Sequence, residues 1–264
     1  LGFTDHDVSI VFGGVSFVPA HGLDSSEISA KKGAQIDTSE VLGILHSSAI
    51  SEDDISLGRF DSAKVTTYRV NWRNIWMREK MRVDTIGEIV RADGIFRAEL
   101  RSQQQALNIV KGRRYQYLCD VMVGASRCGI DTQSSLYKGT GIVVSIESRT
   151  TLTLSGLGGF ASGWFAMGRA IWTSGKRIQL NDGITSHKLS AGIAALGFSE
   201  PLGDWVKTGD SANVFVGCDR RFSTCKDKFS NEINYQGFPH IPGNDHVFSY
   251  LKSGDSLDGE AIIK

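Results

Sequence analysis

The stretch IVVSIESRTTLTL (residues 142–154) contains two short runs rich in β-branched residues, one on each side of a turn near Arg149. Such runs are typical of strands, because branched side chains pack well on a pleated surface. The whole chain has thirty glycines and only four prolines, and the glycines are spread along its length. That bias suits many short strands joined by tight turns, so the sequence predicts a structure built mainly from β-hairpins.

The same pattern recurs on both sides of this stretch. Residues 8–18 alternate apolar with small or polar side chains around Gly13-Gly14, which can supply the positive φ angles of a two-residue turn. A second hairpin is predicted over residues 86–100 around Ala92-Asp93-Gly94. Further strands are predicted over residues 65–72, 164–172, 177–180 and 214–217. Helical periodicity is scarce and predicts only short helices, over residues 39–46 and 103–110.

The length and composition are those of a globular protein with one large or two ordinary domains. The chain has 264 residues, of which 41% are hydrophobic, enough to form a real core. A polar break at Lys111-Gly112-Arg113-Arg114 is the best domain boundary. We therefore predict a mainly β protein with few short helices, made of two small β domains, barrels or sandwiches, over residues 1–112 and 113–264.

The charge balance argues against a dedicated nucleic-acid-binding protein. The 29 basic residues equal the 29 acidic residues, whereas nucleic-acid binders usually have a basic excess. No apolar run approaches the length of a membrane span. The chain begins Leu-Gly-Phe without an initiator Met, and further residues are expected upstream.

The four cysteines fall into two local pairs, which predicts one shared site. Cys119 and Cys128 are separated by eight residues, and Cys218 and Cys225 by six. Basic residues flank both pairs, and nearby cations favour the deprotonated thiolate that binds metals. The flanking residues are Arg113, Arg114, Arg127, Arg220, Arg221, Lys226 and Lys228.

Several interpretations of these cysteines remain open from the residues alone. They could be free core cysteines, although three of them lie among charged residues. They could form two disulfides, which requires an oxidising compartment and allows three connectivities. A zinc site usually has two to four residues between paired ligands, so gaps of eight and six fit it poorly. An iron–sulfur cluster has a larger body and suits wider spacing.

Three motifs in the sequence are specific enough to compare with known families. They are GFTDHD (residues 2–7), RCG (residues 127–129) and GCDRRFSTCKDKF (residues 217–229), the last continuing as NEINYQGFPHIPG (residues 231–243). The sequence resembles the tail hub proteins of gene transfer agents and related prophages. These are homologous to the minor tail protein L family of lambda-like phages. The resemblance spans nearly the whole chain.

This resemblance implies a structural role rather than an enzymatic one. It implies a hub or baseplate component at the tail tip of a virion or gene transfer agent particle, made and assembled in the bacterial cytoplasm. It implies a [4Fe–4S] cluster joining the two parts of the fold, with four ligands: Cys119, Cys128, Cys218 and Cys225.

The implied partners are those of a ring around the tail axis. They are further copies of the chain in a threefold ring, the distal tail protein at the end of the tube, and the large central tip or fibre protein. DNA would pass through the ring transiently, and contact with the host envelope would be indirect. The alternatives are a cysteine-dependent hydrolase that acts on the cell wall and a soluble zinc-binding module.

Other suggestive motifs favour structural interpretations. Asp5-His6-Asp7 is more typical of a turn than of a metal site, and so is the loop with His240, Asp245 and His246. GLGGFA (residues 156–161) fits the dinucleotide-binding pattern, but no amphipathic helix follows it. The tryptophans are expected in the core by default, although some could serve interfaces; they are Trp72, Trp76, Trp164, Trp172 and Trp205.

Overall fold

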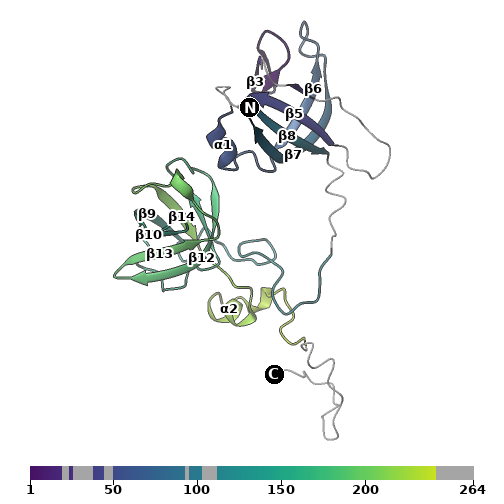
Figure 1. Ribbon diagram of the computed structural model, residues 1–264. Coiled ribbons are helices and arrows are strands. Elements are labelled where there is room, and N and C mark those ends of the chain that lie inside the picture. The colour runs from purple at the N-terminus through teal and green to yellow at the C-terminus, as the bar shows by residue number, and fades with distance from the viewer. Residues whose placement is uncertain (20–23, 26–37, 45–49, 93–94, 103–111, 242–264) are drawn as a thin grey trace, which may run out of the picture. The chain divides into compact units, whose positions relative to one another are not determined.

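The computed structural model describes residues 1–19, 24–25, 38–44, 50–92, 95–102 and 112–241. The chain divides into two compact units, Leu1–Lys111 and Gly112–Lys264. Both are built mainly from strands, as Figure 1 shows, with few short helices. The prediction of a mainly β protein is thus confirmed. No helix in the described part of the chain is long and apolar enough to cross a membrane.

The described residues of unit 1 form two sheets and one short helix. A three-stranded sheet has the order β1-β3-β2, and a five-stranded sheet has the order β4-β5-β8-β7-β6. Helix α1 (Glu52–Ser56) precedes β6, and the Ser51 side chain accepts a hydrogen bond from the Asp54 N–H at its start. The strands are β1 (Phe3–Thr4), β2 (Ile10–Phe12), β3 (Val15–Pro19), β4 (Asp24–Ser25), β5 (Thr38–Ile44), β6 (Lys64–Val70), β7 (Arg78–Ala92) and β8 (Ile95–Ser102).

Both predicted hairpins of unit 1 are present. Strands β2 and β3 pair antiparallel on either side of Gly13 and Gly14, which have φ angles of 59° and 76°. Strands β7 and β8 pair antiparallel on either side of residues 93–94, which lie outside the described residues.

The predicted helix over residues 39–46 is wrong. Residues 38–44 form β5, which pairs antiparallel with β8 from Thr38–Arg101 to Ile44–Ile95. Seven residues in register with a neighbouring strand outweigh a weak local preference for a helical turn. The other predicted helix, over residues 103–110, lies outside the described residues.

Unit 2 is centred on a closed six-stranded barrel. Going around it, the strand order is β10-β13-β12-β11-β14-β9, and every neighbouring pair is antiparallel. The strands are β9 (Lys138–Ile146), β10 (Thr151–Ser155), β11 (Arg169–Trp172), β12 (Asn181–Ser190), β13 (Ile193–Phe198) and β14 (Ser211–Phe215). Strands β9 and β10 contain the opening stretch, so the predicted hairpin over residues 142–154 is confirmed.

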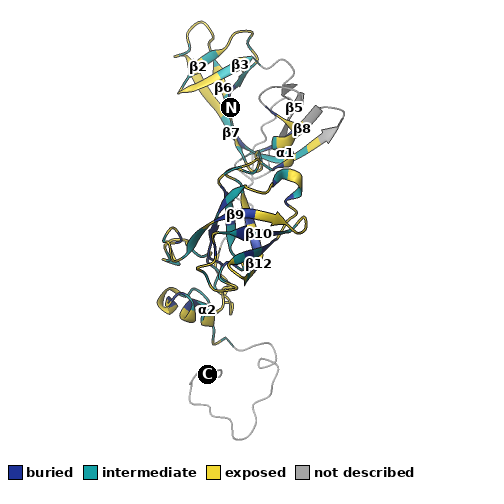
Figure 2. Cartoon of the chain, turned by 90° about the vertical axis from the view of Figure 1, so that its left-hand side faces the viewer, coloured by how far each residue is buried: buried dark blue, intermediate teal, exposed yellow. Residues whose placement is uncertain are grey.

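The barrel encloses the main core of the chain. Leu154, Leu196 and Phe165 are completely buried there, and Figure 2 shows buried residues concentrated along the barrel strands. Burying a side chain of this size contributes roughly 1.5–3 kcal/mol. The indole of the buried Trp172 donates a hydrogen bond to Asp182 Oδ2 at 2.6 Å, so its one polar atom has a partner.

Two strand predictions in this unit need correction. Only Arg169–Trp172 of the predicted strand 164–172 is extended, because the segment before it turns and packs beside the barrel. Residues 177–180 form a turn in which Leu180 N–H bonds to Arg177 O. The next strand, β12, begins at Asn181.

Short helical segments follow the last barrel strands. A 3-10 turn, η2 (Gly203–Trp205), lies between β13 and β14. After β14 come helix α2 (Phe222–Asp227) and a second 3-10 turn, η3 (Glu232–Asn234).

His187 on β12 is a buried titratable group inside unit 2. Its Nδ1 lies 3.5 Å from the Phe165 N–H, and its Nε2 has no hydrogen-bond partner among the described residues. Burial lowers the pKa of His187 below its ordinary value of 6.5, and the nearby charge of Lys228 lowers it further. The folded chain therefore holds this imidazole neutral where the unfolded chain would protonate it.

We predict that acid destabilises the fold through His187. The stabilisation is fully present above pH 6.5 and is lost as the pH falls below it, because protons then bind the unfolded chain preferentially. The slope from one such group approaches about 1.4 kcal/mol per pH unit. The check is urea unfolding of the wild type and His187→Leu at several pH values. The variant should lose part of the acid dependence, and identical slopes would contradict the prediction.

Candidate functional site

Cys119 and Cys128 lie in the segment that precedes the barrel, between residues 113 and 137. This segment has no regular secondary structure and is shaped by turns. Cys128 closes one of them, because its N–H and that of Gly129 both bond to Ala125 O, at 2.9 and 3.1 Å. Gly129 then adopts a φ angle of 74°, a conformation that favours glycine. The turn fixes the position of Cys128 independently of the barrel.

Cys218 follows β14 at a close crossing of two backbone segments. A Cβ atom on Gly217 would lie 1.8 Å from Ala166 O, and one on Gly168 would lie 2.2 Å from Phe215 O. Only glycine allows the two segments to pass at this distance. Cys218 therefore leaves the barrel along a path fixed by the crossing.

Cys225 lies on helix α2, separated from Cys218 by six residues of the chain. Its side chain is buried, and its thiol donates to Asn231 O at 3.3 Å. The helix is continued by backbone bonds from Lys228 N–H to Thr224 O and from Ser230 N–H to Lys226 O.

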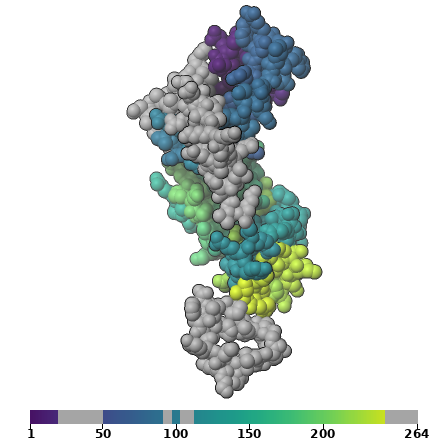
Figure 3. All heavy atoms as spheres, turned by 90° about the vertical axis from the view of Figure 1, so that its right-hand side faces the viewer, coloured from purple at the N-terminus to yellow at the C-terminus, as the bar shows by residue number. Residues whose placement is uncertain are grey.

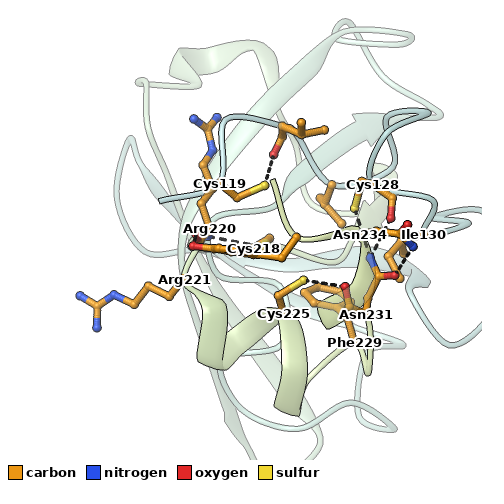
Figure 4. A pocket seen from close by; sticks show the side chains of 13 residues that line it. Cys119, Cys128, Ile130, Cys218, Arg220, Arg221, Cys225, Phe229, Asn231 and Asn234 are labelled. Carbon is orange, nitrogen blue, oxygen red and sulfur yellow. Dashed lines mark hydrogen bonds between the residues drawn. The ribbon is translucent and has the colours of Figure 1, made fainter. Parts of the chain in front are cut away.

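The structure brings all four cysteines to one small cavity (Figure 4). Two come from the segment before the barrel and two from the segment after it. These segments also lie side by side on the surface, as Figure 3 shows. Apolar side chains complete much of the cavity wall: Val121, Val123, Ile130 and Phe229.

Hydrogen bonds to backbone carbonyls hold the two segments together. Cys119 N–H donates to Arg220 O at 2.9 Å, directly beside the second cysteine pair. The hydroxyl of Tyr235 lies 2.7 Å from Tyr117 O and 3.1 Å from Arg220 O. Burial is the main cause that raises the pKa of Tyr235 to about 12, so this hydroxyl keeps its proton and remains a donor. The site is a junction between distant parts of the sequence.

Asn231 is a second connecting residue that sequence reasoning missed. Its buried side chain donates to Cys128 O at 2.7 Å, while its backbone carbonyl accepts from the Cys225 thiol. Its Oδ1 accepts from Asn234 Nδ2 at 2.7 Å. An asparagine six residues after a cysteine gives no local signal of this role, because the contact to Cys128 spans 103 positions.

The thiols lie in an environment that disfavours four free thiolates. Burial raises the pKa of Cys218. Burial is also the main cause that raises the pKa of Cys225 to about 11, and the charges of Cys218, Cys128 and Cys119 add to it. The Arg220 N–H lies 3.4 Å from Cys218 Sγ. These thiols are close enough to influence one another electrostatically, and a bound cation would relieve their repulsion.

The basic residues predicted to surround the thiols do not act as one group. Arg113 pairs with Asp120 at 2.9 Å and also donates to Gln236 O. Arg127 approaches the same carboxylate at 3.6 Å. These arginines therefore help to hold the segments in place, while Arg220 and Arg221 line the cavity.

Lys228 is the basic residue that links α2 to the barrel. Its ammonium donates to Trp164 O at 2.7 Å and to Gly217 O at 2.8 Å, and it lies 4.9 Å from the centre of the Trp164 ring. Burial lowers the pKa of Lys228, and the nearby Cys218 and Asp219 oppose that shift. One side chain thus ties the helix that carries Cys225 to the residue preceding Cys218.

In their present positions, the four thiols do not form the ligand shell of a single metal ion. All four cysteines are free. No group of three or more His, Cys, Asp or Glu side chains within the described ranges could hold one metal ion. Zinc–sulfur bonds of about 2.3 Å would require thiolates within roughly 4 Å of one another.

Of the two other suggested ligand clusters, only Asp5-His6-Asp7 lies wholly within the described residues. His6 lies in a turn. Its ring Nδ1 accepts from Val8 N–H at 3.1 Å, and its backbone N–H donates to Thr4 Oγ1. The second cluster is only partly visible, because Asp245 and His246 lie outside the described residues.

Comparisons with known proteins identify the class of protein. Residues 1–131 match the family described as "Baseplate hub protein, N-terminal attachment domain". Residues 163–245 match the family described as "Phage conserved hypothetical protein BR0599". A comparison with curated protein sequences gives no significant match.

A solved structure of a gene transfer agent covers almost the whole chain. One chain of the "Virion of native gene transfer agent (GTA) particle" is 35% identical, with a TM-score of 0.88. The match covers 98% of the present chain and 89% of that chain. This protein therefore belongs to the family of baseplate proteins shared by phages and gene transfer agents. The narrower resemblance to minor tail protein L remains a prediction.

We predict that Lys228→Met destabilises unit 2 by about 2 kcal/mol, because two carbonyls in a part-buried position lose a charged donor. Urea unfolding followed by circular dichroism measures the change. The matched control is Lys226→Met, an exposed lysine on the same helix, which should stay within about 0.5 kcal/mol of the wild type. Equal stability of the two variants would show that the Lys228 contacts contribute nothing.

Proposed function

We propose that the protein is a structural hub of a phage-like tail tip, and that a [4Fe–4S] cluster bound by its four cysteines joins the two segments that flank the barrel. The observation that carries the proposal is the cavity lined by Cys119, Cys128, Cys218 and Cys225. Cysteine thiolates are the usual ligands of such clusters.

The residues around the cavity suit a cluster better than a single ion. The thiols lie around one cavity yet do not meet the spacing of a mononuclear site. A body of several iron and sulfide atoms is wider than one ion, so its ligands stand further apart. The Arg220 N–H near Cys218 Sγ is a donor of the kind that tunes cluster sulfurs.

The physical effect of such a cluster would be a cross-link. The two cysteine pairs are separated by about ninety residues that form most of the barrel. Tying the ends of a long loop restricts the unfolded chain and favours the folded one. When bound, the cluster supplies iron–thiolate bonds. The chain supplies the ligands, the backbone donor beside Cys218 and the apolar wall.

The assembly role rests on the family. Both matched families are phage families, and the related solved chain belongs to a gene transfer agent virion. We propose that this chain forms a threefold ring in a tail, between the distal tail protein of the tube and the central tip or fibre protein. The ring would line the path of DNA, and its contact with the host envelope would be indirect.

A cysteine-dependent hydrolase is less well supported. A catalytic thiol needs a base such as histidine within hydrogen-bond reach. The described residues that line the cavity include no His, Asp or Glu. The thiols instead lie within hydrogen-bond distance of backbone groups and of the Asn231 side chain.

We predict that protein purified without oxygen contains iron and acid-labile sulfide, on the order of four of each per chain. Cys218→Ser should lose nearly all of both and should unfold at a lower temperature. Iron analysis, visible absorbance and thermal unfolding measure these changes. The matched control is Ser223→Ala, an exposed residue between the same two cysteines, which should retain the cluster.

Metal analysis also separates the alternatives. Detection of zinc in a colourless protein would support a zinc-binding module in place of the cluster. Full iron content in Cys218→Ser would contradict the proposed ligand set. Absence of both metals from protein purified without oxygen would contradict a metal site altogether.

A further inference from the structure

The loop between β6 and β7, residues 71–77, exposes large apolar side chains. Trp76 is 82% exposed, Met77 61% and Trp72 55%. The expectation that tryptophans lie in the core is wrong for Trp72 and Trp76. Exposed tryptophan flanked by arginine is the composition that dominates binding energy at protein interfaces.

This loop has a defined shape. Asn71 N–H donates to Met77 O at 2.9 Å, and Met77 N–H donates to Asn74 O at 2.9 Å. The side chains of Asn71 and Asn74 accept from Arg73 N–H and Trp76 N–H. An exposed loop held in one conformation loses less entropy when it binds.

Cations cover the exposed indoles. The Arg73 guanidinium lies 4.8 Å from the centre of the Trp72 ring, and that of Arg78 lies 5.7 Å from the Trp76 ring. Between residues 64 and 82 there is one acidic residue, Glu79, and six basic ones: Lys64, Arg69, Arg73, Arg78, Lys80 and Arg82. Because Arg82 pairs with the buried Asp84 at 2.6 Å, the basic excess of this hairpin lies in the other five residues around the loop. Its binding partner should therefore be acidic.

An acidic surface of matching character lies on the same unit. Residues 51–61 contain one basic residue, Arg59, and four acidic ones: Glu52, Asp53, Asp54 and Asp61. Arg59 pairs with Asp54 at 3.0 Å, and the other three acidic residues are exposed. Ile55 and Phe60 lie among them; both pack against Ile50 and Ala98 and remain only partly exposed.

The two surfaces cannot meet within one copy of unit 1. Strand β6 begins beside the α1 segment and ends at the loop, so its seven residues separate them by about 23 Å. Figure 2 shows α1 at the other end of the unit from β2, whose Phe12 ring lies 5.2 Å from Arg78 beside the loop. Two different surfaces at opposite ends of a unit suit a head-to-tail contact between copies.

We propose that the loop of residues 71–77 of one copy docks on the α1 surface (residues 51–61) of the next copy of this chain. The inference rests on the proposed role in a ring-shaped assembly and names the contact that would build it. The tryptophans would pack on Ile55 and Phe60, while the basic hairpin would face Glu52, Asp53 and Asp61. Such a contact closes a ring when the rotation per copy allows it.

Charge reversal on the full chain tests the contact. Sedimentation velocity at roughly 1–100 μM protein should show concentration-dependent self-association, weaker in about 0.5 M salt than in 0.05 M. Arg73→Glu with Lys80→Glu, and separately Glu52→Lys with Asp53→Lys, should each weaken self-association at least about tenfold. One chain with all four changes has complementary surfaces again and should recover to within a few-fold of the wild type.

Two further variants establish that the effect is specific to this contact. Glu200→Lys, an exposed charge change in unit 2, should leave self-association unchanged. Trp76→Ser should weaken it without altering the thermal unfolding temperature. A wild type that stays monomeric, unaffected charge-reversed pairs, or a fourfold variant that fails to recover while folded would each overturn the proposal.

The outcome is independent of the cluster. Iron content should be the same in all these variants. Absence of iron from the wild type would therefore refute the cluster without bearing on this contact. Single-stranded DNA is the other partner that an aromatic, basic loop could bind. If Arg73→Glu and Trp76→Ser abolish DNA binding but leave self-association intact, the loop serves nucleic acid and the proposal is overturned.

Discussion

The arrangement of unit 2 depends on one backbone crossing beside the barrel. Gly168 and Gly217 let two segments pass so closely that any side chain at either position would collide with a carbonyl oxygen. Because β14 leads directly into this crossing, the direction in which the chain leaves the barrel is fixed. Cys218 follows immediately, and the Lys228 ammonium donates hydrogen bonds to the carbonyls of Gly217 and Trp164. The crossing therefore anchors the Cys218 side of the cysteine cavity to the barrel.

The first pair of cysteines, Cys119 and Cys128, is held at this site by hydrogen bonds rather than by an apolar core. Cys119 N–H bonds to Arg220 O, and Asn231 connects the Cys128 carbonyl to the Cys225 thiol. Each bond of this kind contributes only about 1 kcal/mol. The junction combines several such bonds with few buried apolar residues, so a metal cross-link would contribute more here than inside the barrel.

The sequence predicted the hairpins better than the isolated elements. Gly13-Gly14 marked a turn correctly, because glycine adopts positive φ angles that few other residues tolerate. The helix predicted over residues 39–46 is a strand instead, since the strand that pairs with it, β8, lies more than fifty residues away in the sequence. The four cysteines could be named from spacing, but Asn231 could not, because its contact with Cys128 arises only after folding. The exposure of Trp76 was equally hidden, since the sequence alone does not separate core tryptophans from exposed ones.

The closed barrel also decides which part of the chain can pair with other sheets. Each of its six strands has a hydrogen-bonded neighbour on both sides, so this barrel offers no free edge for strand addition. The five-stranded sheet of unit 1 remains open, and β6 is one of its outer strands. Lys64 and Arg69 lie along that edge, and charged side chains there discourage indiscriminate pairing. Protection against unwanted aggregation is thus achieved by closure in one unit and by charge in the other.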